Sequence, residues 1–323
     1  MLLVAGAAYH AAPFLPYVWD DDVLIAGLGG LEASLGTRLS AAWSPFLDVY
    51  FRPIPLSLLA VELGAGRFAP LLSHAVNLGA FVLACLALMS WLRAEQLSDH
   101  AAGLTAVLVA SLPVASEAVL WTSARGDLLV VCCAGLLLAL TAKRFPIRLG
   151  RSSPRPDDHG GGVAGLVLLL LLALLSKESG IAVALAVGVR ALWPTFIGQG
   201  RPGGRTIWWV VPALLVGAFL LLRWAVLPEL PPPEMLEPEG ADRVLLSLAT
   251  VAAQTSRVFW PWLPDLSVGL RAVPPAGDLA PWLGLAVLSV AGGLAVMAKR
   301  LGAPRVALAS ILFLLFLAPT SNV

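Results

Sequence analysis

Tyr17-Val18-Trp19-Asp20-Asp21-Asp22 places three consecutive carboxylates at the end of the first apolar segment of the chain. Later charged groups repeat this arrangement, because they also lie at the ends of long apolar segments. The sequence is 59% hydrophobic and 13% charged, whereas soluble domains carry about 25% charged residues. We therefore expect an all-α, polytopic integral membrane protein, in which helices satisfy the backbone hydrogen bonds inside the bilayer.

Nine apolar segments are candidate membrane-spanning helices, although several are shorter than the about 20 residues that cross a bilayer. They are residues 1 to 18, 69 to 92, 101 to 117, 128 to 145, 163 to 176, 179 to 197, 207 to 227, 281 to 298 and 306 to 318.

Two long outer loops are each expected to contain an amphipathic helix. In the first loop, residues 56 to 63 follow Pro53 and Pro55, a pattern that favours a short helix with proline in its first turn. In the second loop, polar residues recur every three or four positions and predict a polar stripe on one helix. The stripe consists of Arg243, Ser247, Thr250, Gln254 and Arg257. This helix either lies at the membrane interface or forms a tenth span.

Basic residues indicate the orientation of the chain. With a cytoplasmic N-terminus, the inner loops hold twelve of the 21 basic residues, Arg190 among them, and four of the 20 acidic residues. Positive charge concentrates on the cytoplasmic side of membrane proteins, so the acidic face is expected outside. We expect a multi-pass protein of the bacterial inner membrane with its site facing the periplasm or exterior. The net charge of +1 and the absence of a basic tract argue against nucleic acid as a partner.

The chain is expected to form a single transmembrane domain over residues 1 to 323 and to be incomplete at one or both ends, since the apolar segments start and stop abruptly.

Three cysteines lie within apolar segments and are expected to be packing residues: Cys85, Cys132 and Cys133. His10, His100 and His159 lack the spacing of metal ligands, so no structural zinc is predicted. A divalent cation at Asp20 and Asp21 is compatible with the sequence but not required.

Charged candidate site residues fall in four groups on the expected outer side, where charge at the membrane boundary is costly unless it is paired, hydrated or functional. These groups are Asp20, Asp21 and Asp22; Arg52; Glu117, Arg125 and Asp127; and Lys177 and Glu178. Simpler interpretations remain, because the acids could cap helices and Lys177 could pair with Glu178. His74 and Asn77, which lie about one helical turn apart, are either hydrogen-bonding residues or further site residues.

Taken together, these groups suit one reaction. A carboxylate can deprotonate an acceptor hydroxyl, and cations such as Arg52, Arg125 or Lys177 can stabilise a phosphate leaving group. An inverting glycosyl transfer from a lipid-linked donor needs both. Rival functions are a transporter or flippase, which should carry ionisable residues near the middle of its spans, and a non-catalytic membrane scaffold.

Six motifs in order resemble the polytopic GT-C glycosyltransferases that use polyprenyl- or dolichyl-phosphate sugars, closest to the protein O-mannosyltransferase-related group that often carries tetratricopeptide repeats. The motifs are Tyr17-Val18-Trp19-Asp20-Asp21, Phe51-Arg52-Pro53, Ser73-His74-Ala75-Val76-Asn77-Leu78, Glu117 to Leu129, Leu175-Ser176-Lys177-Glu178-Ser179-Gly180-Ile181 and Pro319-Thr320-Ser321-Asn322. The chain departs from the family pattern at Ala115, where a histidine is expected.

The resemblance implies an inverting transfer of a hexose, most plausibly mannose, from a polyprenyl phosphate to a protein or glycan acceptor. It further implies that Asp20 or Asp21 acts as the general base. Asp22 leaves the register of the acid pair ambiguous by one residue. Membrane lipid is the other expected partner.

Overall fold

The computed structural model describes residues 7–18, 20–46, 50–112, 114–147, 162–199, 206–227, 240–259 and 279–317. These residues form helices and connecting turns. The described part of the chain contains no β-strand, and its one β-type contact is an isolated antiparallel bridge between Phe46 and Tyr50. The all-α prediction is confirmed for these residues.

Contacts divide the chain into two compact units, Met1–Pro194 with Gln199–Glu229, and Thr195–Gly198 with Leu230–Val323. The single domain expected from the sequence stays a prediction. The first unit contains the following helices, except for the last two residues of α10: α2 (Asp21–Gly27), α3 (Leu35–Ala42), α4 (Pro53–Glu62), α5 (Ala69–Ala94), α6 (Asp99–Ser111), α7 (Val114–Leu120), α8 (Arg125–Arg144), α9 (Gly162–Ser176), α10 (Gly180–Phe196) and α11 (Ile207–Val226). Its short 3-10 helices are η1 (Ala12–Phe14), η2 (Leu63–Phe68) and η3 (Thr122–Ala124).

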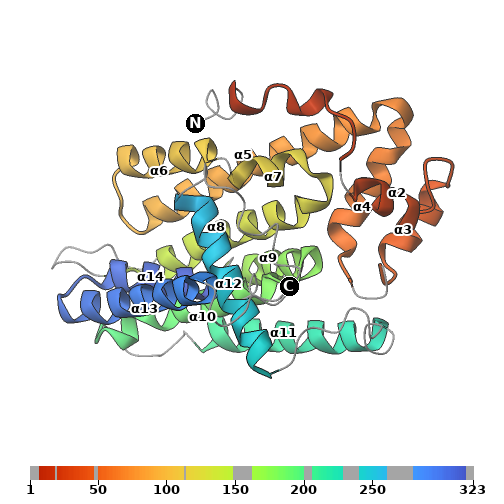
Figure 1. Ribbon diagram of the computed structural model, residues 1–323. Helices are drawn as coiled ribbons and strands as arrows, with labels where there is room; N and C mark the ends of the chain where they lie inside the picture. Colours follow the sequence, from red (N-terminus) through yellow and green to blue (C-terminus); the bar gives the residue numbers. More distant parts are fainter. Residues whose placement is uncertain are drawn as a thin grey trace. The chain divides into compact units, whose positions relative to one another are not determined.

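The centre of the first unit is the pair formed by α5 and α8, which lie against each other in Figure 1. Gly135 permits their close approach, because a Cβ added there would lie 2.7 Å from the carbonyl carbon of Ala87. Small residues at helix interfaces let backbones approach closely in membrane proteins. This pair is the frame on which the polar residues at one end of both helices are placed.

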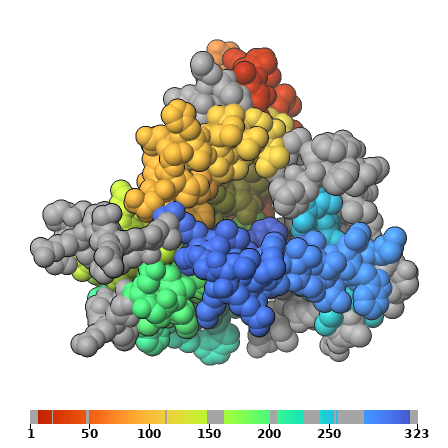
Figure 2. Space-filling view, turned by 90° about the vertical axis from the view of Figure 1, so that its left-hand side faces the viewer, coloured from red at the N-terminus to blue at the C-terminus, as the bar shows by residue number. Residues whose placement is uncertain are grey.

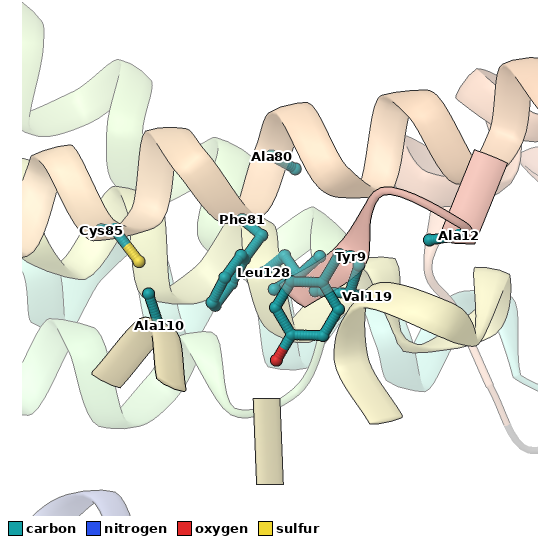
Figure 3. Packing of buried hydrophobic residues seen from close by; sticks show 8 residues of the cluster. All are labelled: Tyr9, Ala12, Ala80, Phe81, Cys85, Ala110, Val119 and Leu128. Atoms are coloured by element: carbon teal, nitrogen blue, oxygen red, sulfur yellow. The ribbon is translucent and has the colours of Figure 1, made fainter. Parts of the chain in front are cut away.

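The segment before the acidic residues is anchored on that frame. Tyr9 and Ala12 are buried in a hydrophobic cluster with Phe81 of α5, Val119 of α7 and Leu128 of α8, as Figure 3 shows. The rings of Tyr9 and Phe81 meet edge to face with centroids 5.6 Å apart. The loop that contains Asp20 and Asp21 therefore starts from a fixed position.

Helices long and apolar enough to cross a membrane number four in the described part of the chain: Pro53–Ala94, Thr122–Arg144, Ile207–Val226 and Leu279–Arg300. Shorter apolar helices occupy Gly162–Ser176, Gly180–Phe196, Val244–Ala253 and Pro304–Phe316. The structure therefore does not confirm the nine spans expected from the sequence. It does confirm a helical protein with several apolar helices.

Three sequence expectations differ from the structure in detail. Residues 7 to 9 are helical and residues 12 to 14 form η1, but residues 10–11 and 15–18 interrupt the segment, so it is not one continuous helix. The segment 101 to 117 is divided into α6 and α7 at Leu112, which has extended backbone angles (φ −71°, ψ 130°), the conformation favoured for a residue that precedes proline. Arg190, counted with the inner loops, lies inside α10 and is fully buried.

Apolar side chains cover the outer surface of α6. Leu104 and Leu108, about one turn apart, are 60% and 58% exposed, and Figure 2 shows α6 in gold on the surface of this unit. Exposed leucines one turn apart suit contact with lipid chains.

The second unit contains α12 (Gly240–Phe259), α13 (Leu279–Arg300) and α14 (Pro304–Leu317). The helix predicted from the polar stripe is confirmed as α12. Thr250 is buried and its hydroxyl donates to the carbonyl of Leu246, while Ser247 is half-buried. The side chains of Arg243, Gln254 and Arg257 lie outside the described residues, and the position of α12 relative to a membrane stays a prediction.

Candidate functional site

Asp20 and Asp21 have different surroundings, although they are neighbours in the sequence. Asp20 is exposed, and its Oδ1 accepts hydrogen bonds from Trp121 Nε1 at 2.6 Å and from Ser123 Oγ at 3.0 Å. Both bonds fall on the same oxygen. Among the described residues no donor is bonded to Oδ2, which is therefore the oxygen that can take a proton from an incoming group.

Asp21 is completely buried and ties two loops together. Its carboxylate accepts from the backbone amides of Val18 at 3.1 Å, Ser123 at 3.0 Å and Thr122 at 3.4 Å. Burial raises the pKa of Asp21 above its ordinary value, although these hydrogen bonds act in the opposite direction. Asp22, in contrast, is exposed in the first turn of α2. The structure thus distinguishes an accessible acid, Asp20, from a buried acid that fixes the loop.

The turn that binds both acids, residues 121 to 125, is held in place by a buried ion pair. The Arg125 guanidinium contacts both Glu62 oxygens at 2.9 Å, with side chains only 1% and 5% exposed. Arg125 Nε also donates to Asn77 Oδ1 at 2.7 Å, and Asn77 Nδ2 donates to the Trp121 carbonyl at 2.9 Å. Two nitrogens of the guanidinium, Nε and Nη2, are thus hydrogen-bonded, while Nη1 lies 2.9 Å from Glu62 Oε1 without the geometry of a hydrogen bond.

Residues at the start of α5 fix the loop that leads to the acids. Ser73 Oγ donates to Glu62 Oε2 at 2.6 Å and lies 3.2 Å from the Tyr17 hydroxyl. His74 Nε2 lies 3.1 Å from the Pro16 carbonyl; because a carbonyl only accepts, Nε2 carries the proton in this bond. His74 and Asn77 are both buried and are hydrogen-bonded within the protein.

A second polar cluster lies where α9 ends and α10 begins. Lys177 Nζ contacts both oxygens of Asp127 at 2.8 and 2.7 Å. Glu178 pairs with Arg52 at 2.8 Å and with Arg223 at 3.0 Å. Burial alone would raise the pKa of Glu178, but Arg52 and Arg223 together bring it below its ordinary value. The three cations remain partly accessible, with side-chain exposure of 26% for Arg52, 30% for Lys177 and 29% for Arg223.

Local packing explains why Arg52 reaches this cluster. Phe51 is buried against Leu174 of α9 and Phe219 of α11, and Pro53 begins α4 directly afterwards. Arg52 is therefore held between helices that are remote in the sequence. Its guanidinium also lies over the ring of Tyr50, 4.4 Å from the centroid.

Gly126 connects the two clusters. It lies between Arg125 and Asp127, and a Cβ added there would be 2.8 Å from the Ser176 carbonyl oxygen and 3.5 Å from Lys177 Cβ. The start of α8 therefore packs directly on the backbone that precedes Lys177 and Glu178. The acid loop, the ion pair and the cationic cluster are therefore linked through the turn 121 to 125 and the start of α8, and we call them together the polar region of the first unit.

The structure brings most of the predicted site residues into this region: Asp20, Asp21, Arg52, His74, Asn77, Arg125, Asp127, Lys177 and Glu178. Glu117 is half-buried in the first turn of α7, one turn before Trp121, whose amide bonds to its carbonyl. Trp19 lies outside the described residues.

Two site residues were not predicted from the sequence, Glu62 and Arg223. Glu62 could have been suspected, since a lone acid in the apolar helix 56 to 63 must find a partner when it is buried. Arg223 lies near the end of a long apolar segment, and nothing in its local sequence indicates that it meets Glu178.

No group of three or more His, Cys, Asp or Glu side chains suited to a metal ion occurs among the described residues. Comparisons with protein families, with characterised proteins and with solved structures give no match for this chain.

Proposed function

We propose that the chain is a membrane glycosyltransferase that moves a hexose, mannose in this proposal, from a polyprenyl phosphate to a hydroxyl of a protein or glycan acceptor. The observation that carries the proposal is the accessible carboxylate of Asp20, with one oxygen held by Trp121 and Ser123 and the other without a bonded donor among the described residues. Such a fixed and accessible carboxylate is suited to act as a general base.

In this proposal the acceptor hydroxyl gives its proton to Asp20 Oδ2 as its oxygen forms a bond to the anomeric carbon of the sugar. The bond between that carbon and the phosphate oxygen breaks, and its electron pair leaves with the polyprenyl phosphate. Attack from the face opposite the phosphate inverts the anomeric configuration. Asp21, buried and bonded to three backbone amides, keeps Asp20 in place.

The leaving group gains negative charge, because a phosphodiester becomes a phosphomonoester. Lys177, Arg52 and Arg223 are the partly exposed cations in this region and are the proposed partners of the phosphate. Asp127 and Glu178 orient these cations through the ion pairs described above. Arg125 has a different role here, since its buried guanidinium is engaged by Glu62 and Asn77.

We also propose that the site faces the exterior of a bacterial inner membrane, in a chain that crosses the bilayer nine times. The support is the distribution of basic residues in the sequence and the four long apolar helices. The shorter apolar helices α9 and α10 would cross as partners of longer ones, with the cationic cluster at their junction.

The test is sugar transfer in membranes supplied with a labelled polyprenyl-phosphate hexose. We expect Asp20→Asn to lower the transfer rate by about 100-fold or more, the usual contribution of a general base. Glu32→Gln is the matched control, because Glu32 is also an exposed acid of the same outer loop.

Two results would overturn the proposal. Unchanged transfer by Asp20→Asn would remove the base from the mechanism. Absence of transfer by the wild type would favour the scaffold, or the flippase if the labelled lipid instead moves between the leaflets of reconstituted vesicles.

A further inference from the structure

Glu62 contacts Arg125, which is part of the turn that binds Asp20 and Asp21, but Glu62 itself touches neither acid in any described contact. It is the last residue of α4, it is 4% exposed, and it compensates the charge of Arg125. A buried carboxylate in an apolar helix is costly, and apolar residues of similar volume often replace such pairs without loss of stability. The position of this pair therefore calls for an explanation other than stability.

The contacts lead from Glu62 to the acids in four steps. Glu62 holds Arg125, Arg125 Nε holds the Asn77 side chain, and Asn77 holds the Trp121 carbonyl. The same Trp121 donates its indole N–H to Asp20 at 2.6 Å. The turn that follows Trp121 supplies the amides that bind Asp21. Both acids are thus placed by one turn, and that turn is fixed to α4 through Glu62.

We propose that Glu62 is a positioning residue for the acid pair, acting through Arg125 and Asn77 on the turn 121 to 125. The inference rests on the proposed sugar transfer for its kinetic part, but not for its structural part. Removal of the carboxylate leaves Arg125 buried without a counter-charge and releases Asn77 and the turn. The phosphate-binding cations, which do not contact Glu62 in any described interaction, keep their place.

The chain contains a matched control for this pair. Arg190 and Glu95 form another buried pair of the same kind, with both Glu95 oxygens contacted by the guanidinium and a further bond from Arg190 to the Phe145 carbonyl at 2.9 Å. Glu95 directly follows α5, at the end of the helix that is remote from Ser73 and Asn77. Glu95→Gln therefore breaks an equivalent ion pair away from the acid site.

The experiment measures carboxyl labelling with a water-soluble carbodiimide and glycine ethyl ester, read at each aspartate by peptide mass spectrometry. In the purified wild type, Asp20 is labelled and the buried Asp21 is protected. We expect Glu62→Gln and, more strongly, Glu62→Ala to expose Asp21 to labelling, whereas Glu95→Gln leaves Asp21 protected. Elution as a folded, monodisperse species is checked for each variant. If Glu62→Ala does not fold, the test rests on Glu62→Gln, whose side-chain oxygen can still accept the hydrogen bond from Ser73.

In the transfer assay, we expect Glu62→Gln to lower kcat by about 10- to 100-fold, as small displacements of catalytic groups do, with the KM for the lipid donor unchanged. Protected Asp21 in both Glu62 variants would overturn the proposal. Equal exposure in Glu95→Gln would also overturn it, because the loosening would then be general. If the wild type transfers no sugar but Glu62→Ala exposes Asp21, the proposed function fails while the positioning by Glu62 stands.

Discussion

Asp21 is a carboxyl group whose ionisation opposes folding. Burial raises its pKa above the ordinary value of 3.8, so the unfolded chain loses this proton at lower pH than the folded protein. Its contribution to stability is therefore lost as the pH rises through the raised pKa. We expect Asp21→Asn, which is neutral at every pH, to become more stable relative to the wild type as the pH increases from about 4 to 7. Thermal unfolding in detergent across this range measures the difference in stability between variant and wild type, and a difference that is constant with pH would contradict the argument.

Glu178 has the opposite pH dependence. Although burial disfavours its charge, Arg52 and Arg223 lower its pKa below the ordinary value of 4.5. Its contribution to stability is present above that value and is lost as the pH falls through the lower, folded-state pKa. At neutral pH we expect Glu178→Gln to be less stable by about 1–2 kcal/mol, between the values for exposed and buried pairs. The stability of variant and wild type should converge in acid, and a difference that grows as the pH falls would refute the pairing.

At the scale of single elements, helix positions follow from the sequence where apolar runs and prolines are clear. The segment 56 to 63 was correctly predicted to be a short helix after proline, and it is α4, which begins at Pro53. Hydropathy alone predicts one span over the segment 101 to 117, because it ignores Pro113, whereas the structure divides the segment into α6 and α7. In the structure α8 begins at Arg125, so Arg125 and Asp127 lie in its first turn. Hydropathy does not predict this start, because the apolar segment begins only at residue 128.

The junction at Gly126 provides a test at this scale. An added Cβ would be 2.8 Å from the Ser176 carbonyl oxygen, which is backbone and cannot rotate away. We expect Gly126→Ala to move the start of α8 from the 176 to 178 turn, to break the Lys177–Asp127 contact and to lower sugar transfer by about 10-fold or more. Gly79→Ala in α5 is the control, because a Cβ added at Gly79 would meet no atom within 4 Å outside the backbone of its own helix. Equal transfer by the two variants would show that the junction tolerates the displacement.

At the scale of the whole chain, composition predicted the helical, apolar character, but the pairing of charges depends on contacts that no local pattern encodes. Arg125 was expected to bind phosphate because it lies in a short polar loop. Its actual partners, Glu62 and Asn77, are 63 and 48 residues away. Arg190 looked like an inner-loop charge, and only the packing of α10 near the ends of α5 and α8 explains how it is buried. Long-range ion pairs of this kind decide which charged residues remain available to a ligand.

The orientation of the chain in the membrane gives the last prediction. Helix α5 has 26 residues, about 39 Å at 1.5 Å per residue, which exceeds the about 30 Å of a bilayer core. The acid site lies beside the start of α5, and the exposed His100 follows its other end in α6. In a variant without Cys85, Cys132 and Cys133, we expect Glu32→Cys to react with a membrane-impermeant maleimide added to intact cells, because the acidic loop faces outward. His100→Cys should react only after the membrane is permeabilised. Labelling of both cysteines from the same side would mean that α5 does not cross the bilayer, and the proposed access of an external acceptor to Asp20 would then fail.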